Sequence, residues 1–96
     1  MTSNDSIIYV GSKPPMSYVL AVVTQFQNGA EEVVVKARGR VISRAVDVVE
    51  IVKHKIMKDD NIQVGKIEIT TEKMTGEHGE VNVSVITIPL KKGIKE

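Results

Sequence analysis

Lys36-Ala-Arg-Gly-Arg-Val-Ile-Ser-Arg44 is the stretch around which the fold of this chain is predicted to form. Residues 32–38, which lead into it, contain three consecutive valines, a pattern typical of a strand buried on both faces of a sheet. Residues 40–57, which follow, place apolar side chains at helical spacing. Gly39 therefore lies where a strand turns into a helix, and the free N–H groups at a helix start favour anions.

The same stretch carries four cations and no acid, in a chain whose formal net charge is only +1. These cations are Lys36, Arg38, Arg40 and Arg44. Because the planar guanidinium group matches the geometry of phosphate, the turn is a candidate phosphate-binding site. Arginines beside a glycine are also common in solvated loops, and spacing alone favours that second interpretation.

The chain before this stretch is predicted to form a strand and then a helix. Residues 7–10 are a short β-branched run that ends at Gly11, as strands often do. A proline-containing loop over residues 12–15 leads into the helix, and Asn28-Gly29 ends it. The buried stripe of this helix is predicted at Met16, Val19, Leu20, Val23 and Phe26.

The chain after the stretch is predicted to form one further helix and two strands. The strands span residues 64–74 and 80–90, with a hairpin loop at 75–79. In the last strand the apolar positions change parity between Val85 and Ile86, which indicates a β-bulge or a strand whose halves face different partners. Pro89 favours an edge or a strand end. The buried face of the helix is predicted at Val41, Ala45, Val48, Val49, Val52 and Ile56.

The predicted order of elements is β-α-β-α-β-β, which defines the expected fold class. We expect an α/β two-layer sandwich, with a four-stranded mixed sheet, two helices and a long hairpin between the last two strands. A chain of 96 residues is expected to form a single domain over residues 1–96. Its ends, residues 1–6 and 92–96, are expected to be mobile.

Composition argues against several classes of function. The chain contains no cysteine, which excludes thiolate metal sites and thiol chemistry. His54 and His78 lack neighbours at ligand spacing, so no metal and no cofactor is expected. The longest strongly apolar run, residues 19–23, is far too short to span a membrane, and we expect a protein inside the cell with no membrane partner.

The carboxylates of the second helix do not suggest catalysis. Asp47 and Glu50 lie one turn apart, with Arg44 and Lys53 flanking them at a spacing that favours ion pairs on a helix surface. No acid–base residue lies near Gly39 outside this group, so we do not expect an enzyme.

Two longer segments carry a resemblance to a known family. They are Ile8-Tyr-Val-Gly-Ser-Lys-Pro-Pro-Met-Ser-Tyr-Val-Leu-Ala21 and Val34-Val-Lys-Ala-Arg-Gly-Arg-Val-Ile-Ser-Arg-Ala-Val-Asp47, which Val48-Val-Glu-Ile-Val52 continues. These segments resemble the archaeal Alba family of chromatin proteins, and the Lys-Ala-Arg-Gly-Arg-x-Ile-Ser block is the specific part. The resemblance covers nearly the whole chain, and the family shares the element order predicted here.

The resemblance implies a homodimer that binds double-stranded DNA, and often RNA, without strong sequence preference. In the family the loop after the first strand and the Arg-Gly-Arg turn face the nucleic acid, and the hairpin lies along the minor groove. Tyr18 matches a family tyrosine, although a half-buried helix position or a dimer interface fits it as well. Asn82 is a candidate minor-groove donor on the polar face of the last strand. The remaining site residues are Lys13, Lys36, Arg38, Gly39, Arg40 and Arg44.

The chain departs from the family pattern in three places. The family's Gly-Lys-Lys-Pro, to which its lysine acetylation is attached, is Gly11-Ser-Lys-Pro14 here. Ile56 stands where relatives often place an aromatic residue for contact between dimers. The hairpin is acidic, with Glu72, Glu77 and Glu80 against Lys73.

The expected function is that of an architectural nucleic-acid-binding protein. We expect it to compact chromosomal DNA as a homodimer, with further association between dimers, in the cytoplasm on the chromosome (nucleoid). Its affinity would come from phosphate neutralisation rather than from reading bases. An RNA-binding subunit in RNA processing or translation is the alternative, and the sequence leaves both open.

Overall fold

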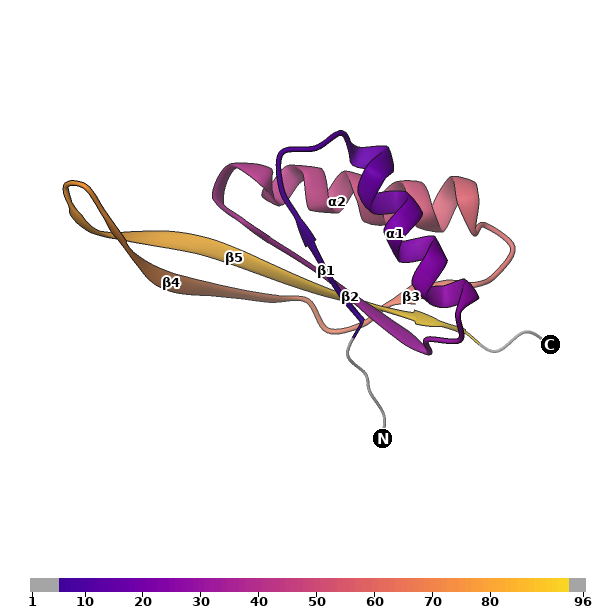
Figure 1. Ribbon diagram of the computed structural model, residues 1–96. Coiled ribbons are helices and arrows are strands. Elements are labelled where there is room, and N and C mark those ends of the chain that lie inside the picture. The colour runs from indigo at the N-terminus through magenta and orange to yellow at the C-terminus, as the bar shows by residue number, and fades with distance from the viewer. Residues whose placement is uncertain (1–5, 94–96) are drawn as a thin grey trace.

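The computed structural model describes residues 6–93, in which two helices cover one face of a five-stranded sheet (Figure 1). A 3-10 turn (Gly39–Val41) precedes the second helix and a π-helical turn (Val52–Ile56) follows it. The predicted α/β two-layer sandwich is confirmed. The elements are β1 (Ile7–Val10), α1 (Pro15–Gln27), β2 (Glu32–Arg38), α2 (Ile42–Ile51), β3 (Ile62–Val64), β4 (Glu68–Gly76) and β5 (Gly79–Lys92).

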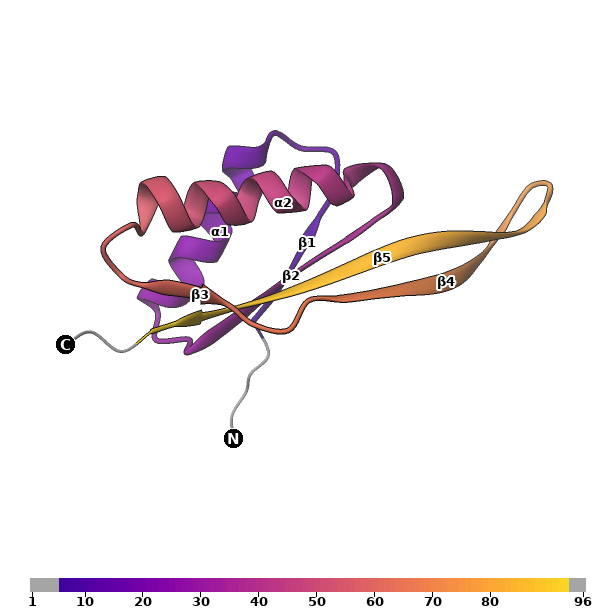
Figure 2. The ribbon, with the colours of Figure 1, turned by 180° about the vertical axis from the view of Figure 1, so that it is seen from behind.

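The sheet is mixed, and β5 holds it together. β1 runs parallel to β2, while β5 lies antiparallel to β2 on one side and to both β3 and β4 on the other. The sheet has five strands rather than four because the third predicted strand, residues 64–74, is divided. β3 pairs with residues 90–92 and β4 with residues 79–87, so half of β5 belongs to the body and half to a projecting hairpin (Figure 2).

Pro89 lies opposite the break between β3 and β4. Its carbonyl oxygen accepts the N–H of Gly65 at 2.8 Å. Because the N and C=O of a strand residue point to the same side, the missing N–H of Pro89 also faces this break and leaves no ladder partner unsatisfied. A Cβ at Gly65 would lie 3.2 Å from Pro89 Cγ, so glycine permits the close approach. Of the two alternatives predicted for Pro89, the edge strand is wrong because β5 is central, whereas the strand end agrees with the position of Pro89 close to Lys92, the last residue of β5.

The core lies between the sheet and the two helices. Along β2, Val33, Val35 and Ala37 are buried in this core, whereas Val34 is only half-buried. The prediction that this strand is buried on both faces is therefore wrong for one face. The reason is architectural, because both helices lie on the same side of the sheet (Figures 1 and 2).

The buried stripe of α1 is rotated relative to the predicted one. Val22 is fully buried although it was not predicted, whereas Met16 and Leu20 are 54% and 67% exposed. The prediction is wrong for these two residues because α1 packs against α2 as well as against the sheet, which moves the centre of its contact surface toward Val22. The buried residues are Val19, Val22, Val23 and Phe26.

At the end of the second helix, the buried side chain is one residue later than predicted. The Met57 N–H donates to the Val52 carbonyl oxygen, five residues earlier, at 2.8 Å. This π-type turn shifts the following side chains around the helix axis, so Met57 is buried and Ile56 is 49% exposed. Ile56 was wrongly predicted to be buried. The prediction is confirmed for Ala45, Val48, Val49 and Val52, and Val41 is half-buried.

The change of parity in β5 occurs without a bulge. The pairing of β5 with β2 and with β4 proceeds one residue at a time without interruption. Ile86, Ile88 and Leu90 pack on the helix side, whereas Val85 is buried outside that core and pairs with Arg38. The second alternative, a strand whose halves face different partners, is confirmed.

The described chain is held in place close to both ends. The Ser6 carbonyl oxygen accepts the Val34 N–H at 2.8 Å, and Lys92 pairs with Ile62. The Gly93 N–H also donates to the Asn61 carbonyl oxygen at 2.8 Å. Residues 1–5 and 94–96 of the predicted mobile ends lie outside the described residues.

The π-type turn generates a stability prediction. Met57→Ala should lower the free energy of unfolding by about 2–4 kcal/mol, because it leaves a cavity at a buried position. Ile56→Ala, the matched control one residue earlier, should cost less than about 1 kcal/mol because that side chain is half exposed. Denaturant unfolding at one fixed protein concentration measures both. Equal costs, or a larger cost at Ile56, would show that the helix continues without the wider turn.

Candidate nucleic-acid interface

The two loops that carry most of the predicted site residues lie at the same end of the sheet. β1 and β2 are parallel, so the loop over residues 11–14 and the 3-10 turn Gly39–Val41 both follow a carboxyl end of a strand. The hairpin of β4 and β5 extends beyond Arg38 at this same end (Figure 1). Loops at the carboxyl ends of neighbouring strands are a common place for ligand sites.

The strand-to-helix turn has the predicted position. β2 ends at Arg38, and Gly39 takes a left-handed conformation with φ of +58° before the chain enters α2. Glycine adopts this conformation without the steric cost that a side chain would add. Arg38 and Arg40, on either side of Gly39, are both exposed. The turn thus presents two guanidinium groups to solvent.

Arg44 ties the two loops together. Its Nη1 donates to the carbonyl oxygens of Gly11 at 3.2 Å and of Lys13 at 3.0 Å. We predicted Arg44 as a phosphate contact, but the structure commits one of its nitrogens to the backbone of the neighbouring loop. The observed role of Arg44 is to hold the loop of Lys13 against α2, and this contact joins residues 31 positions apart.

Tyr18 supports the same loop from α1. Its hydroxyl accepts the backbone N–H of Lys13 at 3.0 Å, and its ring is half-buried against the core. A Cβ at Gly11 would lie 3.3 Å from this hydroxyl, so the glycine leaves room for it. Among the alternatives from the sequence, a half-buried helix position describes Tyr18. The exposed Lys13 side chain is thereby presented from a loop that is fixed from two sides.

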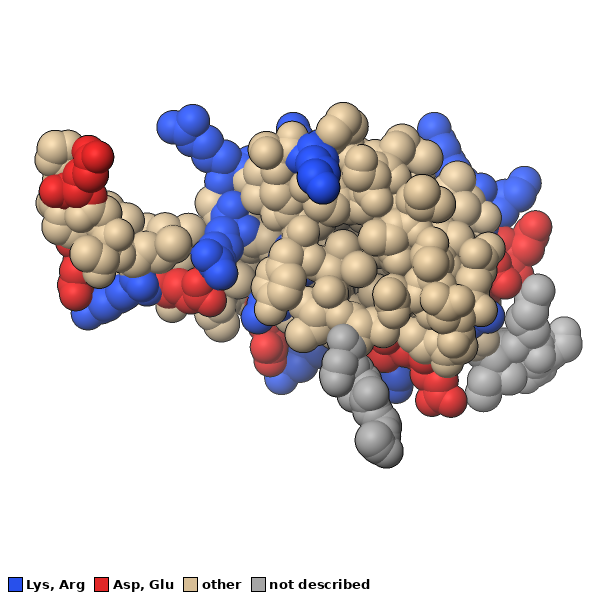
Figure 3. All heavy atoms as spheres, in the orientation of Figure 1, with Lys and Arg blue, Asp and Glu red and all other residues tan. Residues whose placement is uncertain are grey.

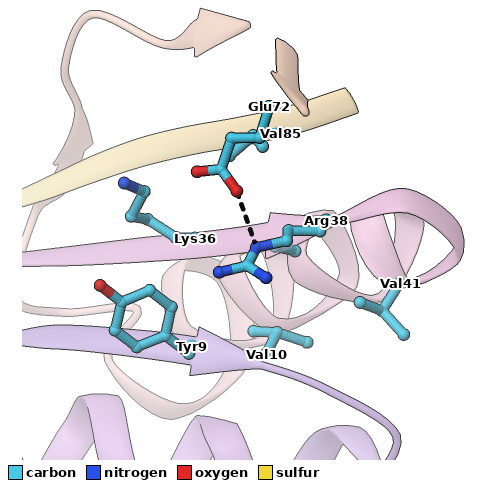
Figure 4. Close-up of a pocket in the computed structure, with 8 residues that line it drawn as sticks. Tyr9, Val10, Lys36, Arg38, Val41, Glu72 and Val85 are labelled. Atoms are coloured by element: carbon cyan, nitrogen blue, oxygen red, sulfur yellow. Dashed lines mark ion pairs between the residues drawn. The ribbon is translucent and has the colours of Figure 1, made fainter. Parts of the chain in front are cut away.

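Arg38 has a partner that the sequence did not reveal. Its Nε lies 3.3 Å from Oε1 of Glu72 on β4, and both side chains are about half exposed (Figure 4). Exposed ion pairs contribute little to stability, so Glu72 acts mainly as a local negative charge beside Arg38. The pairing could not be foreseen because it depends on the registers that place β2 and β4 on either side of β5.

The charges of the hairpin differ from those of the body. Lys and Arg side chains gather where the hairpin joins the body, while the hairpin carries mainly acidic side chains, with a basic one between them (Figure 3). Asn82 is exposed on the hairpin, opposite Lys73 in register, away from the two loops. The predicted five-residue loop is shorter in the structure, because Gly76 pairs with Gly79 and only two residues connect the strands.

The remaining charged side chains show no catalytic arrangement among residues 6–93. Glu50 lies 3.2 Å from Nε2 of His54, one turn later, rather than in an ion pair with Lys53 as predicted. Within the same range, no group of three or more His, Asp or Glu side chains is placed to hold a metal ion.

The structure therefore divides the predicted site residues into four groups. Lys13, Tyr18 and Arg44 form one hydrogen-bonded unit, and Gly39 and Arg40 form the adjacent turn. Lys36 and Arg38 line a cavity on the sheet together with Tyr9, which we did not predict, and Asn82 lies on the hairpin. The run Ile7-Ile-Tyr-Val10 shows no alternation of polar and apolar residues, so the sequence offers no signal that could have identified Tyr9 as exposed.

These features define a two-layer α/β protein with paired basic loops and a projecting β-hairpin. The Alba family model matches residues 6–71, and the chain belongs to the Alba family. The sequence is 54% identical over 89 residues to the DNA/RNA-binding protein Alba of Methanocella arvoryzae, covering 92% of this chain and 91% of that protein. It is 50% identical over 90 residues to the protein of that name from Thermoplasma acidophilum, covering 94% and 99%.

The fold of a solved relative agrees with the structure. Alba from Thermoplasma volcanium superimposes with a TM-score of 0.84 at 52% sequence identity, covering 90% of this chain and 99% of that one. The family resemblance identified from the two sequence segments is thus confirmed.

The bridge between the loops generates a first prediction. Arg44→Ala should speed amide hydrogen exchange of Ser12 and Lys13 by about tenfold, because the loop loses two hydrogen bonds to a charged group that is only partly exposed. Arg40→Ala removes the same charge from the exposed turn and should leave the exchange of these amides unchanged. Exchange followed by NMR distinguishes the two variants. Identical exchange in the wild type and in Arg44→Ala would contradict the structural role of Arg44.

The ion pair generates a second prediction. Glu72→Gln should tighten the binding of a short DNA duplex by about two- to fivefold, because it removes a charge that competes with phosphate for Arg38. Glu68→Gln removes an equal charge from the same face of β4 and serves as the control, with a smaller expected gain. Fluorescence anisotropy at constant salt measures both affinities. A gain of equal size in the two variants would indicate a general charge effect and not competition at Arg38.

Proposed function

We propose that this protein is an architectural nucleic-acid-binding protein that coats double-stranded DNA, and RNA, without strong sequence specificity. The observation that carries the proposal is the pair of basic loops, joined by Arg44, at the end of the sheet from which the hairpin projects. The similar proteins from Methanocella arvoryzae and Thermoplasma acidophilum are named DNA/RNA-binding proteins. These names support a binding role over a catalytic one. We propose that this role is carried out on the chromosome, inside the cell.

The mechanism of binding is phosphate neutralisation. Lys13, Arg38 and Arg40 are exposed and approach a duplex from two adjacent loops, so that their charges release the counterions condensed on the backbone. Contacts with phosphates position the protein on the duplex but do not depend on the base sequence. RNA duplexes offer a similar array of phosphates, which is why the same surface serves both ligands.

The hairpin contributes shape more than charge. Its acidic side chains gain nothing from counterion release, but a two-stranded arm can lie along a minor groove. Asn82 and the backbone groups near it supply short polar contacts there.

We further propose a homodimer. Within the last strand, Val85, Ile88 and Leu90 are buried in one chain, whereas Val81 is 51% exposed and leaves apolar surface for a partner. Further support comes from the start of β4. Ile67, which precedes the strand, is 49% exposed, and Ile69 within it is 77% exposed, so both leave apolar surface uncovered in one copy. Exposed Met16 and Leu20 on α1 offer a second surface for association between dimers on DNA.

No helix within residues 6–93 has the length and apolar character needed to cross a membrane. The proposal involves no membrane partner, metal or cofactor. The relatives' names include RNA as well as DNA, which keeps a role in RNA processing or translation as the second candidate.

The experiment that tests the proposed function is a salt titration of duplex binding. If each dimer engages about six phosphates, the logarithm of the binding constant should fall with the logarithm of salt concentration at a slope of about −5. Arg40→Ala should weaken binding to all duplexes by a similar factor and make the slope about one unit shallower.

The controls of this titration address sequence, fold and assembly. Duplexes of unrelated sequence should bind within a few-fold of one another, and the thermal midpoint of Arg40→Ala should match that of the wild type. Sedimentation at the concentration of the titration establishes the oligomeric state. A flat salt response, or a strong preference for one duplex, would reject the phosphate-neutralisation mechanism.

A further inference from the structure

The face of the sheet opposite the helices carries a cavity beside the basic loops. Its volume is about 360 Å³, and it lies where β1, β2 and β5 meet the base of the hairpin (Figure 4). Tyr9, Lys36, Arg38 and Glu72 supply its polar and aromatic side chains. The apolar lining consists of Val10, Ala37, Val41 and Val85.

Tyr9 is the most exposed aromatic side chain of this protein. The chain has only three aromatic residues. Phe26 is 2% exposed in the core, and the hydroxyl of half-buried Tyr18 accepts the Lys13 N–H. Tyr9 is 62% exposed on the face of the sheet that the helices leave open. A ring in this position exposes a flat apolar surface to solvent at an energetic cost, unless a ligand covers it.

Two cations lie beside this ring. Lys36 is directly opposite Tyr9 in the parallel pairing of β1 and β2, so the two side chains emerge about 5 Å apart on the same face. Arg38 follows on the same face of β2, two residues further along, roughly 7 Å from Lys36. An aromatic surface next to two cations along one strand matches a base and the phosphates that flank it.

Glu72 does not block this arrangement. Its carboxylate contacts Nε of Arg38, and the two terminal nitrogens of the guanidinium group lie on the side away from Glu72, toward Tyr9 and Val10 (Figure 4). The ion pair therefore orients Arg38 across the cavity while its terminal N–H groups face the space beside the ring.

We propose that this cavity binds one unpaired nucleobase, which stacks on Tyr9 while its neighbouring phosphates contact Lys36 and Arg38. The ligand is single-stranded RNA or DNA, or an unpaired segment next to a duplex, because bases within a duplex are stacked on each other and cannot reach the ring. This inference rests on the proposed function for its phosphate contacts and adds to it a second mode of binding. With this second mode, the same surface of the protein would bind duplexes and also single strands released from duplexes.

The test compares single-stranded and duplex ligands in variants of Tyr9. Tyr9→Leu should weaken binding of a short oligoadenylate by about tenfold, since stacking of one base is lost, and should change duplex affinity by less than about twofold. Tyr9→Phe keeps the ring and should retain the affinity of the wild type for both ligands. RNA and DNA forms of the oligoadenylate are compared to establish which strand the site prefers.

A direct signal of stacking completes the test. An oligoadenylate with 2-aminopurine near its centre should lose fluorescence on binding the wild type and Tyr9→Phe, and lose much less on binding Tyr9→Leu. Thermal midpoints confirm that all three proteins are folded.

The outcomes separate this inference from the proposed function. Equal affinity of Tyr9→Leu and the wild type for the oligoadenylate would overturn the base-stacking site, while a steep salt slope for duplexes would leave the proposed function intact. A loss of affinity in Tyr9→Leu that is equally large for duplexes would also overturn it, because the ring would then support the general surface. Loss of single-strand affinity alone supports the site.

Discussion

The antiparallel pairing of β2 with β5 is the contact on which the rest of the structure depends. It places Val33, Val35 and Ala37 beside Leu90, Ile88 and Ile86, and these side chains form the floor on which both helices pack. The same pairing ends at Arg38 and Val85, while β5 continues outward with β4. One strand thereby anchors the core, forms half of the projecting hairpin and sets the distance between the hairpin and the basic turn.

The polar contacts of the interface are few, and they position charges more than they stabilise the fold. Arg44 and Tyr18 fix the loop of Lys13 from two helices, and Glu72 orients Arg38 at the base of the hairpin. Arg38 and Glu72 are about half exposed, so their ion pair contributes little to stability, whereas Tyr18 and Arg44 are partly buried. Their effect is to hold cations in place before a ligand arrives, which lowers the entropy lost on binding.

Much of the fold could be predicted from local sequence patterns. The errors occurred where packing between distant segments determines which residues are buried and where a strand is divided. The bounds of β2 were predicted to the residue, because its valine run identifies a strand and Gly39 follows the last residue of that strand. The burial of Met16, Leu20 and Ile56 was predicted wrongly, because ideal helical spacing ignores both the contact of α1 with α2 and the π-type turn before Met57. The division of the third strand depends on Pro89, 24 positions after Gly65 in the chain.

The candidate site shows the same division between local and long-range information. The sequence by itself determined the family, the basic turn around Gly39 and the residue types available for phosphate, because these depend on residues that are neighbours in the chain. Only the tertiary structure decided that Arg44 bonds the loop of Lys13, that Glu72 pairs with Arg38 and that Tyr9 stands beside Lys36. The physical reason is that each of these contacts joins segments more than 25 residues apart, which the register of the sheet and the packing of the helices bring together.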